Sequence, residues 1–152
     1  MKAGIGEPVF EKLDANLAKA IVSIGAVKAF EVGDGTKVAK AFGSENNDDF
    51  IIDDNGNVTK MSNHAGGILG GISDGSDVLV RAYFKPTPSI FKEQKTVNKS
   101  GENISINIKG RHDPIIVPRA VVVVESMVAL TVLDMLLISM TSDIEKIKKF
   151  FE

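Results

Sequence analysis

Apolar side chains recur at spacings of three and four between Pro8 and Ile24, and this period predicts an amphipathic helix. The opposite face carries charged and amide side chains, as expected of a helix that covers a core with one side. Gly25 follows and supplies the helix stop. The predicted core stripe consists of Phe10, Leu13, Leu17, Ile21 and Ile24.

The following part of the chain has the pattern of short strands. Val27 to Val32 predicts a strand that ends at the turn sequence Gly33-Asp34-Gly35. Phe50 to Asp53 and Val58 to Met61 flank Asn55-Gly56, a strong hairpin signal because both turn residues tolerate positive φ. Residues 37 to 42 fit neither period and remain unassigned.

Apolar and polar residues alternate strictly in two later segments. In Asp77 to Phe84 the apolar residues occupy every second position, which predicts a strand with one buried face. Ile104, Ile106 and Ile108 alternate with polar residues after Ser100-Gly101, so a last hairpin is expected there.

Ala120 to Met140 is almost continuously apolar, with Pro118 suited to the first turn of a helix. A membrane span is disfavoured because Glu125 and Asp134 interrupt the run, at about 2.5–3.5 kcal/mol for each carboxylate at mid-membrane. We therefore expect a helix buried within protein, whose two carboxylates cap a neighbouring helix or pair with an arginine rather than catalyse. Ser142 and Glu145 then predict a capping box that opens a short helix. The order of elements indicates an α+β fold.

Composition narrows the function classes. The 152 residues correspond to one domain or part of one, and 18 basic against 20 acidic residues give a net charge of −2. The chain has no overall positive electrostatic field that would favour binding to nucleic acid or to an anionic membrane, so any anion site is local. Cysteine is absent, which excludes disulfides and thiolate chemistry and agrees with a cytoplasmic location. No metal-ligand spacing, hydrolase triad or signal peptide is present.

Three loops carry candidate phosphate chemistry. Gly66, Gly67, Gly70 and Gly71 let a backbone approach an anion without interference from Cβ atoms. Lys85-Pro86-Thr87-Pro88-Ser89 holds a lysine and hydroxyls on a segment stiffened by prolines. Gly110-Arg111-His112-Asp113-Pro114 combines a guanidinium with a nearby carboxylate. Taken singly, the glycine segment is better explained as a flexible turn and the last loop as a turn with an Arg111–Asp113 salt bridge, and the middle loop could be a rigid surface connector.

Taken in order and with their separations, the three loops closely resemble the C-terminal region of chorismate synthase. The resemblance extends from Gly4-Ile5-Gly6-Glu7-Pro8 to the helix after Arg119. It implies a fold in which long helices are sandwiched between antiparallel sheets, and a cytoplasmic homotetramer. The implied reaction is the 1,4-elimination of phosphate from 5-enolpyruvylshikimate 3-phosphate, which gives chorismate and needs reduced FMN without net redox change.

The resemblance also implies site residues. Arg111 would contact FMN and substrate, and Asp113 would lie near the flavin N5 and assist proton movement. At the first position of Gly25-Ala26 the family commonly has Asn, so that side-chain hydrogen bond is lost here although a backbone contact could survive. His64 and His112 are pH-sensitive candidates or simply solvated loop residues. The implied FMN contacts are Gly25, Ala26, Gly70, Lys85, Pro86, Thr87, Pro88, Ser89 and Arg111.

The family chain is more than twice as long, and its Gly-Glu-Ser-His-Gly motif and arginine-rich substrate segment do not occur in these residues. We therefore expect residues 1–152 to be the C-terminal portion of a chorismate synthase domain, inactive in isolation. Two alternatives stay open: a non-catalytic fragment that self-associates through uncovered apolar surface, and an autonomous flavin- or phosphate-binding module.

Overall fold

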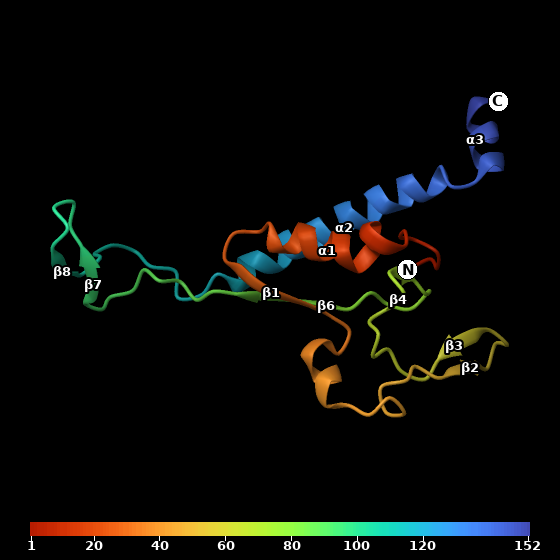
Figure 1. Cartoon of the computed structure of the whole chain (residues 1–152), viewed down its shortest axis with the longest axis horizontal. Helices are drawn as coiled ribbons and strands as arrows, with labels where there is room; N and C mark the ends of the chain where they lie inside the picture. Colours follow the sequence, from red (N-terminus) through yellow and green to blue (C-terminus); the bar gives the residue numbers. More distant parts are fainter.

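The computed structural model describes all 152 residues except the side chain of Lys146. It confirms the α+β class: two long helices pack beside a central strand pair, and smaller hairpins extend from it (Figure 1). The helices are η1 (Val9–Glu11), α1 (Leu13–Val22), η2 (Gly35–Lys40), α2 (Val117–Met140) and α3 (Ile144–Phe151). The strands are β1 (Val27–Val32), β2 (Phe50–Ile52), β3 (Val58–Lys60), β4 (Ile68–Leu69), β5 (Ile72–Ser73), β6 (Val80–Phe84), β7 (Gln94–Val97) and β8 (Asn103–Ile106).

The strands form four antiparallel pairs: β1 with β6, β2 with β3, β4 with β5, and β7 with β8. The central pair joins distant segments, with Phe30 opposite Ala82 and Val32 opposite Val80. The predicted alternation in this region is confirmed, because Val78, Val80, Ala82 and Phe84 are half-buried while the residues between them are exposed.

The core lies where α1 meets the central strand pair and α2. Leu13, Leu17 and Ile21 are fully buried, and Ile68 and Met135 complete the cluster with Ile5. The predicted stripe is thus confirmed over α1. It is wrong at Phe10, which is 87% exposed.

The helix predicted from Pro8 begins five residues later. Residues 9–11 form the 3₁₀ turn η1, and Lys12 then adopts an extended conformation before α1 starts. The cause is tertiary: the Leu13 amide donates to the carbonyl of Gly71 at 2.8 Å, so the glycine hairpin satisfies a free amide of the first turn of α1. A continuous helix would lose this anchor.

Other local predictions are confirmed or corrected. The Asn55-Gly56 hairpin forms as β2–β3, with Gly56 at φ +82°. The unassigned residues after Gly35 form η2, which is held by Thr36 donating from its amide and hydroxyl to the Glu31 carboxylate. The capping box is wrong: Asp143, and not Ser142, caps α3 by accepting from the Glu145 amide.

The long helix α2 is present as predicted, with a proline in its first turn. The helix is not buried as predicted. Only Ala120 and Met135 are buried, because this chain covers a single side of the helix. By length and composition α2 could cross a membrane, and 6% of its apolar window is buried. The expected arginine partners are also missing, since neither Glu125 nor Asp134 forms an ion pair with any described side chain.

Candidate functional site

The candidate flavin residues after α1 lie beside those after β6. The Lys85 amide donates to the Ala26 carbonyl at 2.7 Å, directly beyond the pairing of Val27 with Phe84. Ala26 has φ +70°, an uncommon conformation for a residue with a Cβ. The backbone here is therefore held by its surroundings and not by its own preference. No heavy atom lies within 4 Å of where a Cβ of Gly25 would be, so this edge is open.

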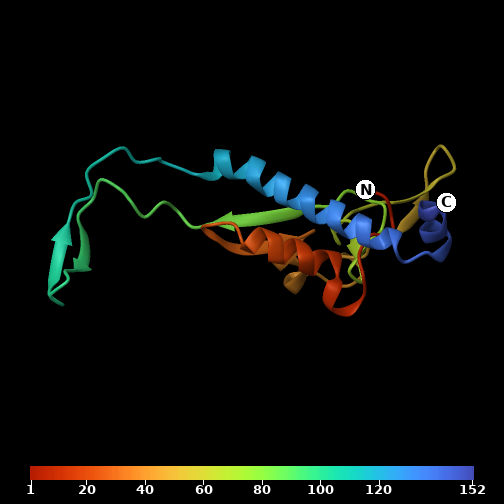
Figure 2. The same ribbon diagram turned by 90° about the horizontal axis from the view of Figure 1, so that it is seen from above.

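Two connectors leave the same end of the body, one from β6 and one toward α2, and lead to the β7–β8 hairpin (Figure 2). One contains Lys85 to Ser89 and the other contains Gly110 to Pro114. His112 joins them, since its Nδ1 lies 2.7 Å from the Ser89 hydroxyl and its Nε2 lies 3.1 Å from the Ile108 carbonyl. Phe91 adds an edge-to-face contact with the imidazole at 4.4 Å between centroids. His112 is thus half-buried and bridges the two predicted loops, and the solvated alternative is wrong for it.

The hydroxyl of Thr87, on the first connector, has an unusual environment. Its Oγ1 is buried and has no hydrogen-bond partner among the described residues. Buried hydroxyls are nearly always satisfied by protein, water or ligand. A ligand with several oxygen and nitrogen atoms, such as FMN, is of the chemical type that would satisfy it. The residues present therefore fit a flavin at this position.

Arg111 and Asp113 do not pair with one another, so the turn salt bridge alternative is wrong. Arg119 at the start of α2 donates from Nη1 to Asp113 Oδ2 at 2.8 Å. Arg111 is exposed and forms no ion pair with the side chains that the structure describes. Its guanidinium is therefore available to an anion.

Gly70 lies apart from these residues. It sits in the tight turn between β4 and β5, and the bond from Leu13 to Gly71 fixes this turn at the first turn of α1. Ala26 follows the other end of α1, a ten-residue helix that spans about 15 Å. The chain alone does not bring Gly70 to Ala26 and Lys85. Gly70 nevertheless has φ +60° and open space around its Cβ position, so its backbone is accessible.

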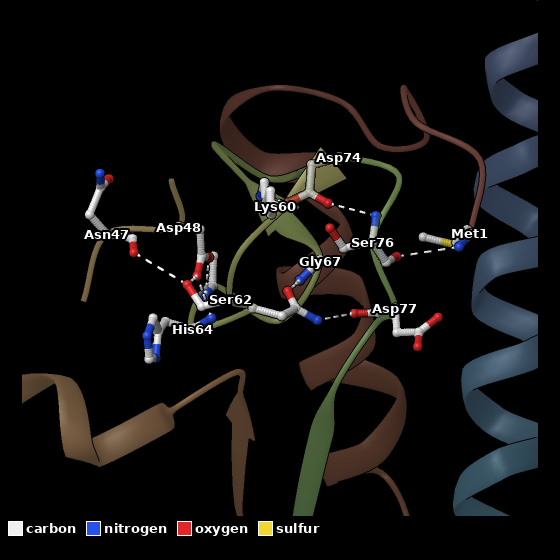
Figure 3. Close-up of polar contacts among 12 residues, drawn as sticks. Met1, Asn47, Asp48, Lys60, Ser62, His64, Gly67, Asp74, Ser76 and Asp77 are labelled. Atoms are coloured by element: carbon white, nitrogen blue, oxygen red, sulfur yellow. Dashed lines mark hydrogen bonds and ion pairs between the residues drawn. The ribbon is translucent and has the colours of Figure 1, made fainter. Parts of the chain in front are cut away.

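A polar framework around the glycine hairpin was not predicted (Figure 3). Asp48 accepts hydrogen bonds from the amides of His64 and Ala65, at 2.7 and 2.9 Å, and from the Ser62 hydroxyl at 2.7 Å. Burial by itself would raise the pKa of Asp48, but these hydrogen bonds outweigh it and hold the pKa below its ordinary value. Asp48 therefore stays ionised and fixes the start of the glycine segment.

His64 is also held in place by Asp34. Its Nδ1 lies 2.7 Å from Asp34 Oδ2, and its carbonyl accepts from the Asp34 amide. A Cβ at Gly33 would fall 2.0 Å from the His64 carbonyl oxygen, so only glycine allows this approach. His64 is thus paired with Asp34, and the solvated alternative is wrong for it as well.

The far side of the hairpin is held by Lys60 and Asp74, whose side chains are 4% and 7% exposed and form an ion pair. Asn63 adds two bonds, accepting from the Gly67 amide and donating to the Asp77 carbonyl. In the sequence these residues look like ordinary surface polar groups. Only Asp48 has a signal in the sequence, because five acidic residues and no base occur from Glu45 to Asp54. No such signal marks Lys60, Asn63 or Asp74. The described residues hold no cluster of three or more potential metal ligands.

Comparison with known proteins gives one consistent family. The family model of chorismate synthase matches residues 1–137. A chorismate synthase from Lachnoclostridium phytofermentans is 69% identical over 150 residues, which cover 99% of this chain and 41% of that protein. One from Methanosarcina barkeri is 60% identical over 136 residues, covering 89% of this chain and 37% of that protein.

A solved structure supports the same likeness. A crystal structure of chorismate synthase aligns with a TM-score of 0.68 at 30% identity, covering 98% of this chain and 37% of that one. The chain thus spans about two fifths of the length of the curated relatives it matches.

Proposed function

This chain belongs to the chorismate synthase family, and on that premise we propose that the protein converts 5-enolpyruvylshikimate 3-phosphate into chorismate. The reaction is a 1,4-elimination of phosphate that depends on reduced FMN. We place the site at the edge formed by Gly25, Ala26, Lys85 to Ser89 and Arg111. We also assign the backbone of Gly70 to the site, although it lies apart from these residues within this chain.

The observation that carries the proposal is the convergence of two connectors. Lys85 is bonded to Ala26, and Ser89 is bonded through its hydroxyl to His112, next to Arg111. These segments are far apart in the sequence, yet the two connectors carry a lysine, a guanidinium and the buried, unsatisfied Thr87 hydroxyl. Such a group of donors suits a ligand with phosphate and carbonyl oxygens.

The chain's own residues have distinct roles. Arg111 and Lys85 stabilise phosphate oxygens, and such contacts strengthen when the assembled site excludes water. Asp113 is oriented by Arg119, which holds Oδ2, so we assign proton movement to Oδ1. Pro86 and Pro88 keep the first connector extended, so little entropy is lost when its donors meet the ligand. When bound, reduced FMN supplies electron density that the elimination uses and returns.

We place the protein in the cytoplasm and assign a homotetramer. The exposed side of α2 is then covered by protein, since Glu125 and Asp134 would each cost about 2.5–3.5 kcal/mol at mid-membrane.

An anaerobic assay tests the function directly. The protein at the full length of its relatives is mixed with 5-enolpyruvylshikimate 3-phosphate and reduced FMN, and released phosphate and chorismate are measured together. We expect both products in equal amounts and none with oxidised FMN. Phosphate release that is independent of flavin would overturn the assignment.

A further inference from the structure

The two connectors that carry the proposed flavin contacts are joined through one side chain, the half-buried imidazole of His112. The strand pairing of the hairpin ends with Gln94 opposite Ile106, so neither connector is held by a strand ladder. Among the described residues, the hydrogen bond and the ring contact that cross between the connectors, to Ser89 and to Phe91, both involve this imidazole. The spacing of the connectors therefore depends on His112.

The partners of the two ring nitrogens set the direction of each hydrogen bond. A backbone carbonyl only accepts, so Nε2 of His112 carries a proton and donates to Ile108 at 3.1 Å. In the neutral ring, Nδ1 then accepts from the Ser89 hydroxyl at 2.7 Å. A charged imidazole keeps both bonds, because Nδ1 can donate to the same hydroxyl oxygen. Phe91 contacts the ring at an interplanar angle of 89° and opposes its rotation away from both partners.

The residues on either side of His112 differ in how they are held. Asp113 accepts from Arg119 at 2.8 Å, so it has an anchor of its own at the start of α2. Arg111 forms no ion pair with the described side chains. The bond from His112 to Ser89 thus bears on the placement of Arg111, whereas the placement of Asp113 is secured separately.

We propose that His112 is a positioning residue, which holds Arg111 at a set spacing from the segment of Lys85 to Ser89 before FMN binds. The first connector is tied to the body by the bond from Lys85 to Ala26 and is stiffened by its two prolines. His112 extends this order to the second connector. Without the bond, FMN bears the entropic cost of ordering the two connectors. The flavin part of this inference rests on the proposed function, whereas the joining of the connectors is independent of it.

The test uses the protein at the full length of its relatives. His112→Ala removes both bonds of the imidazole. His112→Asn keeps a polar atom near the position of Nδ1, and His112→Gln keeps an N–H near the position of Nε2, so these two variants separate the bond to Ser89 from the bond to Ile108. Ser89→Ala, alone and combined with His112→Ala, completes a double-mutant cycle.

Asn98→Ala is the matched control, because Asn98 is a half-buried polar residue of the same hairpin. Its side-chain oxygen accepts from the amides of Ser100 and Glu102, and its side-chain amide donates to the Glu102 carboxylate. These bonds lie within the turn between β7 and β8. The control therefore disturbs the hairpin without removing the contact between the connectors.

FMN affinity is measured by titration, and the elimination rate is measured in single turnovers at saturating reduced FMN. His112→Ala and His112→Gln are expected to bind FMN about tenfold more weakly, and His112→Asn and Asn98→Ala within about threefold of wild type. In the Ser89→Ala background, His112→Ala should cost less than about twofold more. At saturating FMN the rate of the His112 variants is expected to recover, because Arg119 still holds Asp113.

Hydrogen exchange of the ligand-free protein tests the joining without flavin. Peptides that cover residues 107–113 should exchange faster in His112→Ala, and equally fast in Ser89→Ala and in the double variant. Unchanged protection in His112→Ala, or additive effects of the two substitutions, would overturn the joining.

Three outcomes in the flavin assays would overturn the positioning role: wild-type affinity in His112→Ala, an equal loss of affinity in Asn98→Ala, and a rate that stays low at saturating FMN. The last of these would place His112 in the chemical step. A wild-type protein that binds no FMN would instead refute the proposed function, and hydrogen exchange would still decide whether His112 joins the connectors.

Discussion

Arg111 presents a guanidinium that no described carboxylate neutralises, whereas Asp113, two residues on, is held by Arg119. A sequence motif can name both residues but cannot say which of them pair, because the pairing depends on where α2 begins. The Thr87 hydroxyl was likewise part of a predicted segment, yet its burial without a partner is visible only in three dimensions.

Replacing Arg111 by alanine should weaken the binding of FMN, substrate or both. A charge-assisted hydrogen bond is typically worth about 1.5–3 kcal/mol, which corresponds to roughly 10- to 100-fold in affinity. Lys109→Ala is the control, as it removes a nearby exposed cation outside the predicted site. Titration of both ligands decides the point, and unaltered affinities for both in Arg111→Ala would remove this residue from the site.

Asp113→Asn should leave FMN binding nearly intact and lower the elimination rate. Asparagine keeps an oxygen for Arg119 but cannot take up a proton at neutral pH. FMN affinity and single-turnover rates under anaerobic conditions separate the two effects. Turnover at the wild-type rate would exclude Asp113 from proton movement.

At the scale of elements, periodicity predicted α1, β1, the β2–β3 hairpin, β6 and α2 because their patterns are local. It failed where tertiary contacts replaced local ones. The first helical turn predicted before Leu13 is replaced by the hydrogen bond between Leu13 and Gly71. The glycine segment was expected to be a ligand-contacting loop, with a flexible turn as the alternative, and it is a tight hairpin braced by Asp48, Asp34 and Lys60. These braces come from residues 10 to 30 positions away, where sequence period carries no information.

The Asp48 brace gives the protein an acid-sensitive contribution to stability. Its pKa is lowered in the folded state from an ordinary value of 3.8, so the stabilisation is present above that value and is lost as the pH falls through the folded pKa. Asp48→Asn should therefore lower the free energy of unfolding at neutral pH and narrow the difference from wild type at about pH 3. Urea unfolding across this pH range measures the difference, with Asp54→Asn, at an exposed acidic position of the same segment, as control. A difference that is constant with pH would contradict the argument.

At the scale of the whole molecule, the most prominent feature is the uncovered side of α2. The composition predicted an apolar helix, and the expectation that it would be buried assumed partners that this chain does not contain. An apolar groove of about 560 Å³ runs between β6 and α2, lined by Val80, Phe84, Val121 and Val128 among others. Exposed leucines continue the apolar surface along the helix.

The 152-residue chain alone should therefore associate into dimers or larger species. Contiguous apolar surface of this extent is larger than monomers normally tolerate. Leu133→Glu with Leu137→Glu, at two positions that are 51% and 54% exposed, should reduce the association without disturbing the core. Light scattering after size exclusion is the measurement. A wild-type monomer at tens of micromolar, unfolding cooperatively, would mean that the chain covers its core unaided.

The position of the bound flavin is the central feature of the proposed function. A crystal structure of the protein at the full length of its relatives, grown with FMN, is the most direct measurement. We predict that FMN contacts Ala26, the segment from Lys85 to Ser89 including the Thr87 hydroxyl, and Arg111. A bound FMN that contacts neither of the two connectors would contradict the proposed site.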